Sequence, residues 1–561
     1  MAAKKTLQKP GILTCKKQID GAPITLDINH NILNILEESE KLKNHIEFKS
    51  GLSTGNNDYF QKFWYEVDFF SIGFNYKSVK KTKSKDKKWF PCNSGGSFRK
   101  WYGNNEKVIN YENNGYELKN YRDSSGKLKS SLRNKEYYFK KGITYNKIGS
   151  DKFSARYKKH GFVFDDTGRS AFTGNEIWDK IILSFLCSKL SILFLKLMNK
   201  SISFTHSALN RIPFLYNNIK TKKNEIVYLT NSSIDISKRD WDSFETSWNF
   251  KKHPLLTYKN ESNTIKEAFN NWSEFAEDQF YQLKENEEKL NEIFIEIYGL
   301  EDELDPELKE KDVTVRKADR ARDIRSFMSY AVGCMLGRYS LDEEGLVYAG
   351  GEFDHSKYET FKADKDGIIP VLDKEYFDDD IVARFVEFVK VTFGKENLEE
   401  NLEYIADALI EGGTSGQDTA RETIRRYFLF DFIKDHTSEY NKCPIYWLFQ
   451  SDGRGKAFNA LIYMHRYDKG TVSRVRTDYL HELQNKIESE KVRLQNIIDS
   501  DLSGRQRTQA KKDLETLEKQ TAELKEYDQK LNHLANQQIE IDLEDGVKEN
   551  YAKFDEVLKN I

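Results

Sequence analysis

The chain has 561 residues, of which 38% are hydrophobic and 32% charged, and this composition predicts a soluble protein with two to four domains. The formal net charge of −2 excludes a protein that is strongly basic or acidic as a whole. It hides a local separation, because the window from Lys77 to Lys159 holds 23 Lys and Arg against 7 Asp and Glu. That window carries +16 and leaves −18 on the rest, which is the footprint expected of a nucleic-acid-binding surface.

The cysteines and the apolar segments bear on the compartment. Five cysteines are scattered without a Cys-x-x-Cys pair, which argues against a disulfide framework or a zinc site and predicts reduced thiols in the cytoplasm. Residues 1–9 have charge but no apolar core, so no signal peptide is visible. The longest apolar run, from Ile181, contains Lys189 and Lys196 two helical turns apart. It is predicted to be a buried helix with one solvated edge and not a membrane span.

In chain order, residues 1–45 are predicted to be a connector with one short amphipathic helix. Residues 46–215 are predicted to be a mixed α/β domain, because short aromatic and β-branched segments recur there. The predicted strands are FWYEVDFF, KVINYE, YELKNY, EYYFKKGITY and GFVFDD. Asn114-Gly115 lies between two of these strands and predicts a two-residue hairpin turn, since both residues tolerate positive φ.

The rest of the chain is predicted to be mostly helical, which makes the whole an α+β protein. Residues 216–330 form an acidic helical region, whose long helix has apolar side chains at helical spacing. These positions are Trp272, Phe275, Phe280, Leu283, Leu290 and Phe294. Residues 331–478 form a helical domain with one helix that starts after the Asp378–Asp380 cap and stops at Gly394, and a second that starts at Asn397.

Heptad spacing marks the end of the chain. Leu483, Ile487, Leu494 and Ile497 keep this spacing, and after a Ser503-Gly504 break a second leucine series resumes it. Each half is only two to four heptads long, so residues 479–540 are predicted to be an antiparallel helical hairpin. Residues 541–561 remain as a C-terminal tail.

The stretch from Lys87 to Gly115, KKWFPCNSGGSFRKWYGNNEKVINYENNG, concentrates cations, aromatic rings, amides and paired glycines. These are the groups that grip a phosphate backbone and touch base edges. The candidate DNA-binding residues in and near it are Lys87, Lys88, Trp89, Arg99, Lys100, Trp101, Tyr102, Asn104, Asn105, Arg133 and Lys135.

Each group in this set has a plainer interpretation. The cations could form an ordinary solvated face, and the three aromatic residues could belong to the core. The Gly-Asn-Asn sequence and Gly95-Gly96 could be turns. A second basic cluster, Lys469, Arg474 and Arg476, could touch DNA or balance the acidic helices.

Three other motifs are interpreted as structural. The sequence Gly412–Gly416 lacks the lysine and the preceding strand of a phosphate loop, so it is predicted to be a linker. The Asp378–Asp380 triplet sits where a helix cap is expected, and not where a metal site would be. His481-Glu482 lacks the second histidine of a zincin. No catalytic residue and no metal site is therefore predicted in this chain.

Longer strings resemble a known family. WFPCNSGGSFRKWYGNNEKVINYENNGYE, GLSTGNNDYFQKFWYEV, SWNFKKHPLL, AVGCMLGRYSLDEEGLVYAGGEFD and PIYWLFQSDGRGKAFNALIYMHRYDKGTVSRVRTDYLHELQ resemble the adenine-specific DNA methyltransferases of bacterial BREX phage-defence systems, the PglX family. RRYFLFDFIKDH and DLEDGVKENYAKF are similar to the same family, so the likeness covers nearly the whole chain. It implies that residues 46–215 are a DNA target-recognition domain.

The family's catalytic loop is missing from this sequence. An adenine-N6 methyltransferase of this kind needs an Asn-Pro-Pro-Tyr type loop to hold the flipped base, and this chain has 8 prolines but no Pro-Pro pair. The resemblance implies that the catalytic domain lies N-terminal to the matched region and binds S-adenosylmethionine there. This chain is therefore expected to be a non-catalytic half that binds no cofactor itself.

The expected function is recognition of double-stranded DNA for such a methyltransferase. The expected partners are the DNA duplex, the N-terminal methyltransferase domain or subunit and other BREX components, without a membrane. The main alternative is a protein-interaction scaffold that docks other defence components through the helical half. An autonomous nuclease is disfavoured, because no paired-carboxylate-plus-lysine constellation lies on a convincing strand pair.

Overall fold

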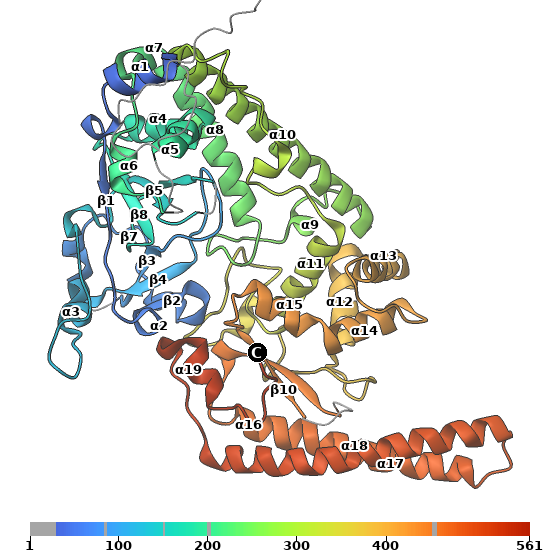
Figure 1. Ribbon diagram of the computed structural model, residues 1–561. Coiled ribbons are helices and arrows are strands. Elements are labelled where there is room, and N and C mark those ends of the chain that lie inside the picture. Colours follow the sequence, from blue (N-terminus) through green and yellow to red (C-terminus); the bar gives the residue numbers. More distant parts are fainter. Residues whose placement is uncertain (1–29, 84–86, 150–151, 199–202, 452–456) are drawn as a thin grey trace, which may run out of the picture.

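The computed structural model describes residues 30–83, 87–149, 152–198, 203–451 and 457–561, and it has the expected α+β architecture. Three small sheets lie among helices, with the N-terminal sheets on one side and the helical part on the other (Figure 1). The long helix α10 (Ile265–Tyr298) runs along the edge that joins the two sides.

Two four-stranded sheets form the N-terminal part. Their strand orders are β1-β8-β5-β6 and β2-β4-β3-β7. The strands are β1 (Glu47–Lys49), β2 (Gln61–Phe63), β3 (Trp89–Asn93), β4 (Lys107–Asn110), β5 (Gly142–Asn146), β6 (Ala155–Lys158), β7 (Val163–Phe164) and β8 (Gly168–Phe172). Among these strands only β3 and β7 pair in parallel, over two residue pairs.

The predicted hairpin at Asn114-Gly115 is wrong. Both residues have positive φ, 61° and 67°, but they form a left-handed turn within the bounds of helix α3 (Glu112–Asn120), so YELKNY is not a strand. Strand β4 already pairs with β2 on one side and with β3 on the other, so no edge was open to a returning strand. In FWYEVDFF only Phe63 is in a strand, and two 3-10 turns follow.

The apolar run from Ile181 forms two helices instead of one. Helices α4 (Glu176–Cys187) and α5 (Lys189–Met198) are bent by 67° at Ser188, so Lys189 and Lys196 do not share a face with the whole run. Most of their apolar side chains are buried in a core shared with the β1-β8-β5-β6 sheet and α10. No single helix in the described ranges is long and apolar enough to cross a membrane. Among the described residues, only the bent pair α4–α5, taken together, has that length and composition.

The predicted helices of the second part are confirmed. Helix α10 begins at its N-cap Thr264 and ends at Gly299, whose φ of 61° closes the helix. Five of its six predicted apolar positions are buried, and Phe275 is partly buried. The other large helices here are α8 (Lys223–Asp242), α11 (Arg320–Met335), α12 (Ile381–Phe393), α13 (Leu398–Glu411), α14 (Ala420–Phe430) and α15 (Phe432–Glu439).

The predicted start and end of helix α12 are confirmed at the residues expected. The Asp380 carboxylate accepts hydrogen bonds from the amides of Val382 and Ala383, and Gly394 ends α12 with a φ of 85°. The same carboxylate pairs with both terminal nitrogens of Arg425 at 2.8 Å, so it is committed to structure and not to a metal. Asn397 precedes α13, also as expected.

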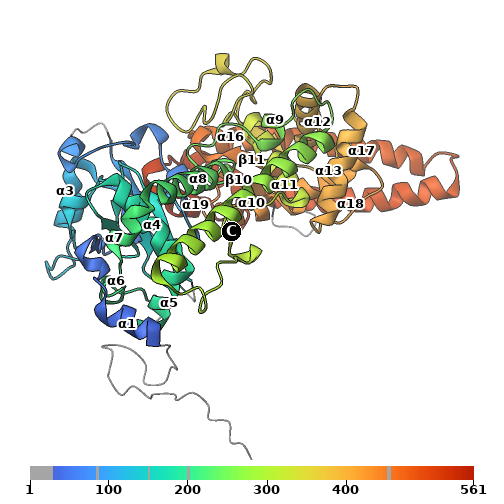
Figure 2. The same cartoon turned by 90° about the horizontal axis from the view of Figure 1, so that it is seen from above.

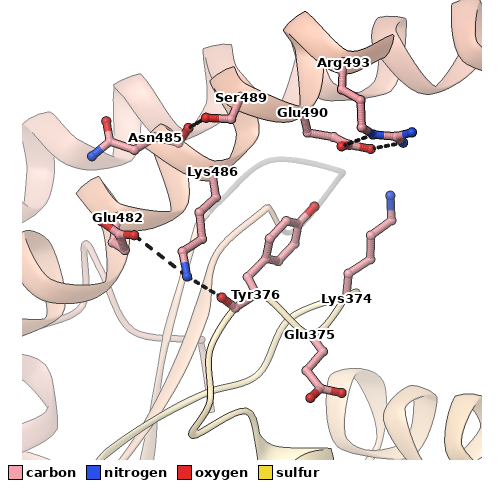
Figure 3. Close-up of a pocket in the computed structure, with 9 residues that line it drawn as sticks. All are labelled: Lys374, Glu375, Tyr376, Glu482, Asn485, Lys486, Ser489, Glu490 and Arg493. Atoms are coloured by element: carbon pink, nitrogen blue, oxygen red, sulfur yellow. Dashed lines mark hydrogen bonds and ion pairs between the residues drawn. The ribbon is translucent and has the colours of Figure 1, made fainter. Parts of the chain in front are cut away.

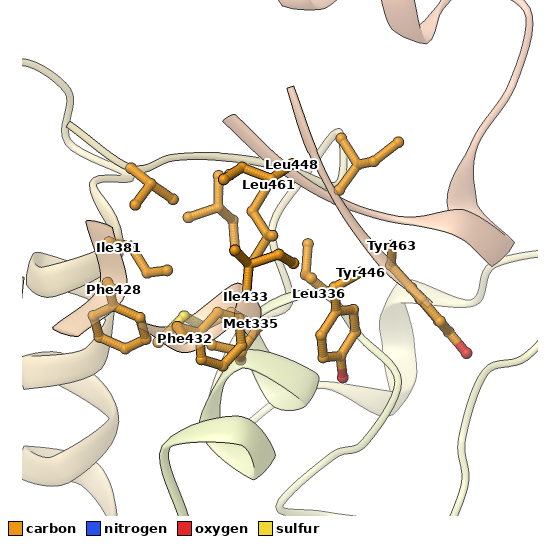
Figure 4. Close-up of a cluster of buried hydrophobic side chains, with 14 of the residues drawn as sticks. Met335, Leu336, Ile381, Phe428, Phe432, Ile433, Tyr446, Leu448, Leu461 and Tyr463 are labelled. Atoms are coloured by element: carbon orange, nitrogen blue, oxygen red, sulfur yellow. The ribbon is translucent and has the colours of Figure 1, made fainter. Parts of the chain in front are cut away.

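A three-stranded antiparallel sheet lies at the centre of the C-terminal core. Its order is β10-β11-β9, with β9 (Ile368–Pro370), β10 (Tyr446–Gln450) and β11 (Asn459–Tyr463). Figure 4 shows Leu448 and Leu461 of this sheet above the ends of α11, α14 and α15. The same core extends from Trp64 to Leu558, so the predicted boundary at residues 215–216 is not a boundary between cores.

The terminal hairpin is present and projects from the body in both views (Figures 1 and 2). Helix α17 (His481–Ile498) runs out and helix α18 (Gly504–Gln537) returns beside it, with Ser503 as the N-cap. Helix α19 (Gly546–Ala552) then packs against the N-terminal sheets, where the Val547 amide donates to the buried Glu66 carboxylate at 2.9 Å. The tail is therefore part of the fold.

Candidate nucleic-acid interface

The stretch that the sequence singled out is mostly a buried connection. We call residues 94–105 the seam loop, because it lies between strand β6 and the helices α8 and α10. Trp101 pairs with Arg156 of the β6 strand, and the Tyr157 amide donates to the Trp101 carbonyl at 2.8 Å. The Trp101 side chain is 1% exposed and its φ is 70°, a conformation that the surrounding contacts must hold.

Arg99 is fixed against helix α8. Its guanidinium reaches the Asp240 carboxylate at 2.5 Å, the Ser237 carbonyl at 3.2 Å and the Tyr102 carbonyl at 2.8 Å. Burial acts to raise the pKa of Asp240, but the Arg316 and Arg99 guanidiniums outweigh it and hold that pKa below its ordinary value. The Arg99 charge is therefore neutralised inside the protein.

Lys100 and Trp101 share one acceptor on helix α10. The Lys100 ammonium pairs with the Glu287 carboxylate, and the Trp101 indole N–H donates to the same carboxylate at 2.8 Å. Both Lys100 and Glu287 are 4% exposed. Burying a charge of either sign is costly unless it is paired, so Lys100 and Glu287 stabilise each other.

Arg99 and Lys100 therefore form neither a DNA-contacting surface nor an ordinary solvated face, and both predictions for them are wrong. Both are buried, at 7% and 4% exposed, and their charges pair with carboxylates of helices that lie 141 and 187 residues further along the chain. The window's high positive charge is in part the complement of the acidic region within one molecule.

The other seam residues are also structural. Asn104 has a φ of 54° and donates to the Ser97 carbonyl at 2.9 Å, so the turn interpretation is the one that the geometry supports. Asn105 and Tyr102 are 7% and 5% exposed. Gly103 has a φ of 126°, and a Cβ there would collide with the Arg99 side chain, which explains the glycine.

Strand β3 meets the end of the chain. The Trp89 indole, 1% exposed, donates to Glu544 at 2.6 Å, and the Lys88 ammonium pairs with the same carboxylate at 3.0 Å. Lys87 donates to the Phe70 carbonyl. Base stacking by Trp89 is therefore not available on this surface, because its ring lies in the core.

Lys158 is a buried cation of another kind. It is 2% exposed and its ammonium has no hydrogen-bond partner among the described residues. It lies 4.3 Å from the centre of the Phe164 ring and 5.1 Å from that of Phe172. Burial lowers its pKa to about 7.

Most of the window's exposed positive charge lies elsewhere, on and around helix α3 and the segment that follows it, whereas Lys159 lies near the Tyr102 ring. Of the predicted set, Arg133 and Lys135 are here and are exposed. Among the described residues of the window, the exposed cations are Lys77, Lys80, Lys81, Arg122, Lys127, Lys129, Arg133, Lys135, Lys140 and Lys159. We call this set the basic face.

Residues 121–129 stand out from the basic face as a tight turn, visible as the loop beyond α3 in Figure 1, and we call this segment the finger. The Lys129 amide donates to the Tyr121 carbonyl and the Asp123 amide to the Lys127 carbonyl, both at 2.9 Å. Arg122 and Leu128 form an antiparallel bridge between the two arms. Sequence reasoning missed the finger's cations, although the Asp-Ser-Ser-Gly turn between basic residues was a readable signal.

The second basic cluster serves the hairpin. Arg474 pairs with Asp468 at 2.9 Å, and Arg476 pairs with Asp528 of α18 at 2.7 Å. Near the base of the hairpin, a groove of about 630 Å³ lies between residues 374–376 and α17 (Figure 3). It is lined by three cations and three carboxylates, and Arg493 is held by Glu490 at 2.6 Å, so it offers no net positive charge to a phosphate.

The glycine pair after strand β3 does not have the surroundings of an S-adenosylmethionine loop. Cofactor loops of that kind follow a parallel strand and lead into a helix N-terminus. The glycine pair Gly95-Gly96 does follow β3, but it leads into the seam loop and strand β4 instead. We therefore derive no methyl-transfer step within this chain.

Comparison with known proteins gives independent evidence about the family to which the chain is similar. No family model matches the chain. Along almost all of its length, the chain is similar to adenine-specific methyltransferases. It is 44% identical over 545 residues to the adenine-specific methyltransferase PglX of Lacticaseibacillus casei (strain Zhang), a match that covers 96% of this chain and 44% of the relative. It is 37% identical over 572 residues to the adenine-specific methyltransferase BrxX of Escherichia coli O9:H4 (strain HS), covering 97% of this chain and 45% of the relative. The chain thus spans less than half the length of these curated relatives.

Proposed function

We propose that this chain is the part of a BREX-type adenine-specific DNA methyltransferase that recognises double-stranded DNA. The observation that carries the proposal is the basic face: ten exposed cations among the described residues of one short window, most of them around helix α3, in a molecule whose net charge is −2. The similarity to two adenine-specific methyltransferases supplies the reaction to which DNA recognition would belong.

In this proposal the work is divided between chain segments. The methyl donor, S-adenosylmethionine, and the flipped adenine would be held by a catalytic domain or subunit, an assignment supported by the lack of a Pro-Pro pair in this chain. The basic face would neutralise phosphates and fix the duplex relative to that domain. The acidic helices would keep the rest of the surface away from the phosphates by like-charge repulsion.

The test is duplex binding by the purified chain across a series of salt concentrations. Counterion release predicts that log K falls linearly with log salt, with a slope close to −0.9 for each phosphate neutralised. A labelled donor and a mixed DNA substrate should give no methyl transfer by this chain alone. Absence of duplex binding even at low salt would refute the proposal, and donor turnover above a buffer blank would refute the division of labour.

A second candidate function is a scaffold that docks other phage-defence components. The observation in its favour is the α17–α18 hairpin, which projects from the body as an arm (Figure 2). The same salt series separates the two functions, because a scaffold without a DNA role has no reason to bind duplex with a steep salt dependence.

A further inference from the structure

We propose that the finger, residues 121–129, enters the major groove of the duplex and that its Arg122–Leu128 face reads base edges. This inference rests on the proposed function and adds to it the groove, the reading residues and the division of roles within the finger. It comes from the shape, the charge and the two faces of this segment.

The shape is fixed before DNA arrives. Besides the two bonds between its arms, the Asp123 carboxylate accepts from the Ser125 amide at 2.9 Å and from the Lys127 amide at 3.0 Å. At the base of the finger, residues Ser53 and Ser131 exchange two backbone hydrogen bonds of 2.8 Å. A segment ordered in this way loses little conformational entropy on binding.

The finger's charge is available to a ligand. Its single acidic group, Asp123, is occupied by the amides of its own turn. The Lys127 side chain is exposed, and its ammonium has no hydrogen-bond or ion-pair partner in the described part of the chain. The finger therefore contrasts with the seam loop, whose cations face carboxylates. No carboxylate in the described part of the chain forms an ion pair with the cations of the finger.

The width of the finger selects the groove. Two paired strands have backbones about 4.8 Å apart, and side chains widen the ribbon further. A major groove about 12 Å wide admits a two-stranded ribbon, whereas a minor groove about 6 Å wide does not. The finger also ends in Gly126, where a Cβ would meet nothing within 4 Å, so the tip is unobstructed.

The two faces of the ribbon differ in chemistry. Residues opposite each other in an antiparallel pair project to the same face, which places Arg122 and Leu128 together. Successive residues alternate, which places Lys127 and Lys129 on the other face. The Lys129 ammonium lies 5.0 Å from the Tyr121 ring centre, in agreement with this alternation.

The Arg122–Leu128 face is suited to base edges. The Arg122 guanidinium donates to the Gly126 carbonyl at 3.0 Å through one nitrogen, and its other N–H groups have no partner among the described residues. A guanidinium can bond the O6 and N7 atoms of guanine together, and an apolar side chain beside it can contact a thymine methyl group. Leu128, 42% exposed, is such a side chain.

The experiment uses the whole chain, a random duplex pool and three sets of variants. Arg122→Ala is expected to weaken binding by about 10-fold and to flatten the preference at one base position. Arg122→Lys keeps the charge without the bidentate geometry, so it should lose the preference while affinity falls less. Lys127→Ala with Lys129→Ala should weaken all sequences alike and reduce the salt slope by about 2.

The matched control is Arg505→Ala with Arg507→Ala, which removes two exposed cations at the far tip of the hairpin. Binding should stay unchanged there. Methyl green, which occupies the major groove, should displace the chain, and the minor-groove ligand distamycin should not.

The outcomes separate this inference from the proposed function. If the unmodified chain binds duplex but the finger variants bind like the control, or distamycin displaces the chain, the finger proposal is overturned and the proposed function stands. If Arg122→Ala weakens all sequences equally, the base-reading role is overturned. Failure of the unmodified chain to bind any duplex overturns the proposed function itself.

Discussion

The seam loop and the finger are 15 residues apart in sequence, carry the same types of residue and have opposite uses. Arg99 and Lys100 are buried against acidic helices, whereas Lys127 and Lys129 extend from the surface. A count of charges treats all four alike. The difference teaches that a basic window reports two things at once: a surface for an anionic ligand and the internal complement of an acidic region elsewhere in the chain.

The strongest test of the comparison removes a seam cation. Lys100→Ala leaves the Glu287 carboxylate buried with only the Trp101 indole as a partner, and we expect the free energy of unfolding to fall by about 3 to 5 kcal/mol. Urea unfolding measures it. The double variant Lys100→Met with Glu287→Met removes both charges and should recover most of the loss. If Lys100→Ala were as stable as the parent, the Lys100–Glu287 ion pair would not stabilise the fold.

For Lys158 we expect the opposite effect: removing this buried cation should raise the free energy of unfolding. Its pKa is about 7 in the folded state and near 10.5 when unfolded, so between about pH 7 and pH 10.5 the unfolded state binds more protons. The resulting destabilisation is fully present below about pH 7 and fades as the pH rises towards 10.5. Lys158→Met should therefore stabilise the protein by about 2 kcal/mol at pH 6, if even half of the shift is realised.

The measurement is unfolding by urea at pH 6 and pH 9.5, with exposed Lys159→Met as the neighbouring control. The gain from Lys158→Met should be smaller at pH 9.5. An equal gain at both pH values would mean that the effect comes from packing and not from the charge.

Trp89 sharpens the comparison, because it was also a candidate for DNA contact. Trp89→Phe keeps most of the ring but removes the indole donor to Glu544, and should lower the unfolding free energy by about 1.5 kcal/mol. Duplex affinity measured well below the melting temperature should stay within 2-fold of the parent. A loss of duplex affinity without a loss of stability would indicate that Trp89 contacts DNA.

The smallest effect is expected in the finger. Lys127→Ala removes an exposed side chain without a partner, so the unfolding free energy should change by less than about 0.5 kcal/mol. Thermal and urea unfolding both check this value. A larger loss would mean that the finger's charge is used within the fold, which would erase its contrast with the seam.

Local rules account for what the sequence predicted well. Asp380 and Gly394 begin and end helix α12 through bonds to residues two to four positions away, and such patterns can be read directly. The heptad leucines of the hairpin likewise face a partner that follows within the same segment. The α+β class follows from these elements.

The candidate site was harder to predict, because burial is decided over long sequence distances. Nothing near Lys100 indicates that Glu287 will cover it. Strand β4 could not be recognised as a central strand from its own residues, and for that reason the turn at Asn114 was misread. The finger was missed for a different reason. Its Asp-Ser-Ser-Gly turn is a local signal, but the candidate DNA-binding residues were chosen mainly from the aromatic stretch Lys87–Gly115.

The return of the chain end to the first sheets has a consequence for biosynthesis. Glu66 and Val547 are 481 residues apart, so at a translation rate of 5 to 20 residues per second roughly 25 to 100 s separate their synthesis. During that interval the nascent sheet at β2 and β3 lacks the amide that satisfies Glu66 and the acceptor of the Trp89 indole. The N-terminal part can start to fold early on the ribosome, but it completes its core only after nearly the whole chain has been made.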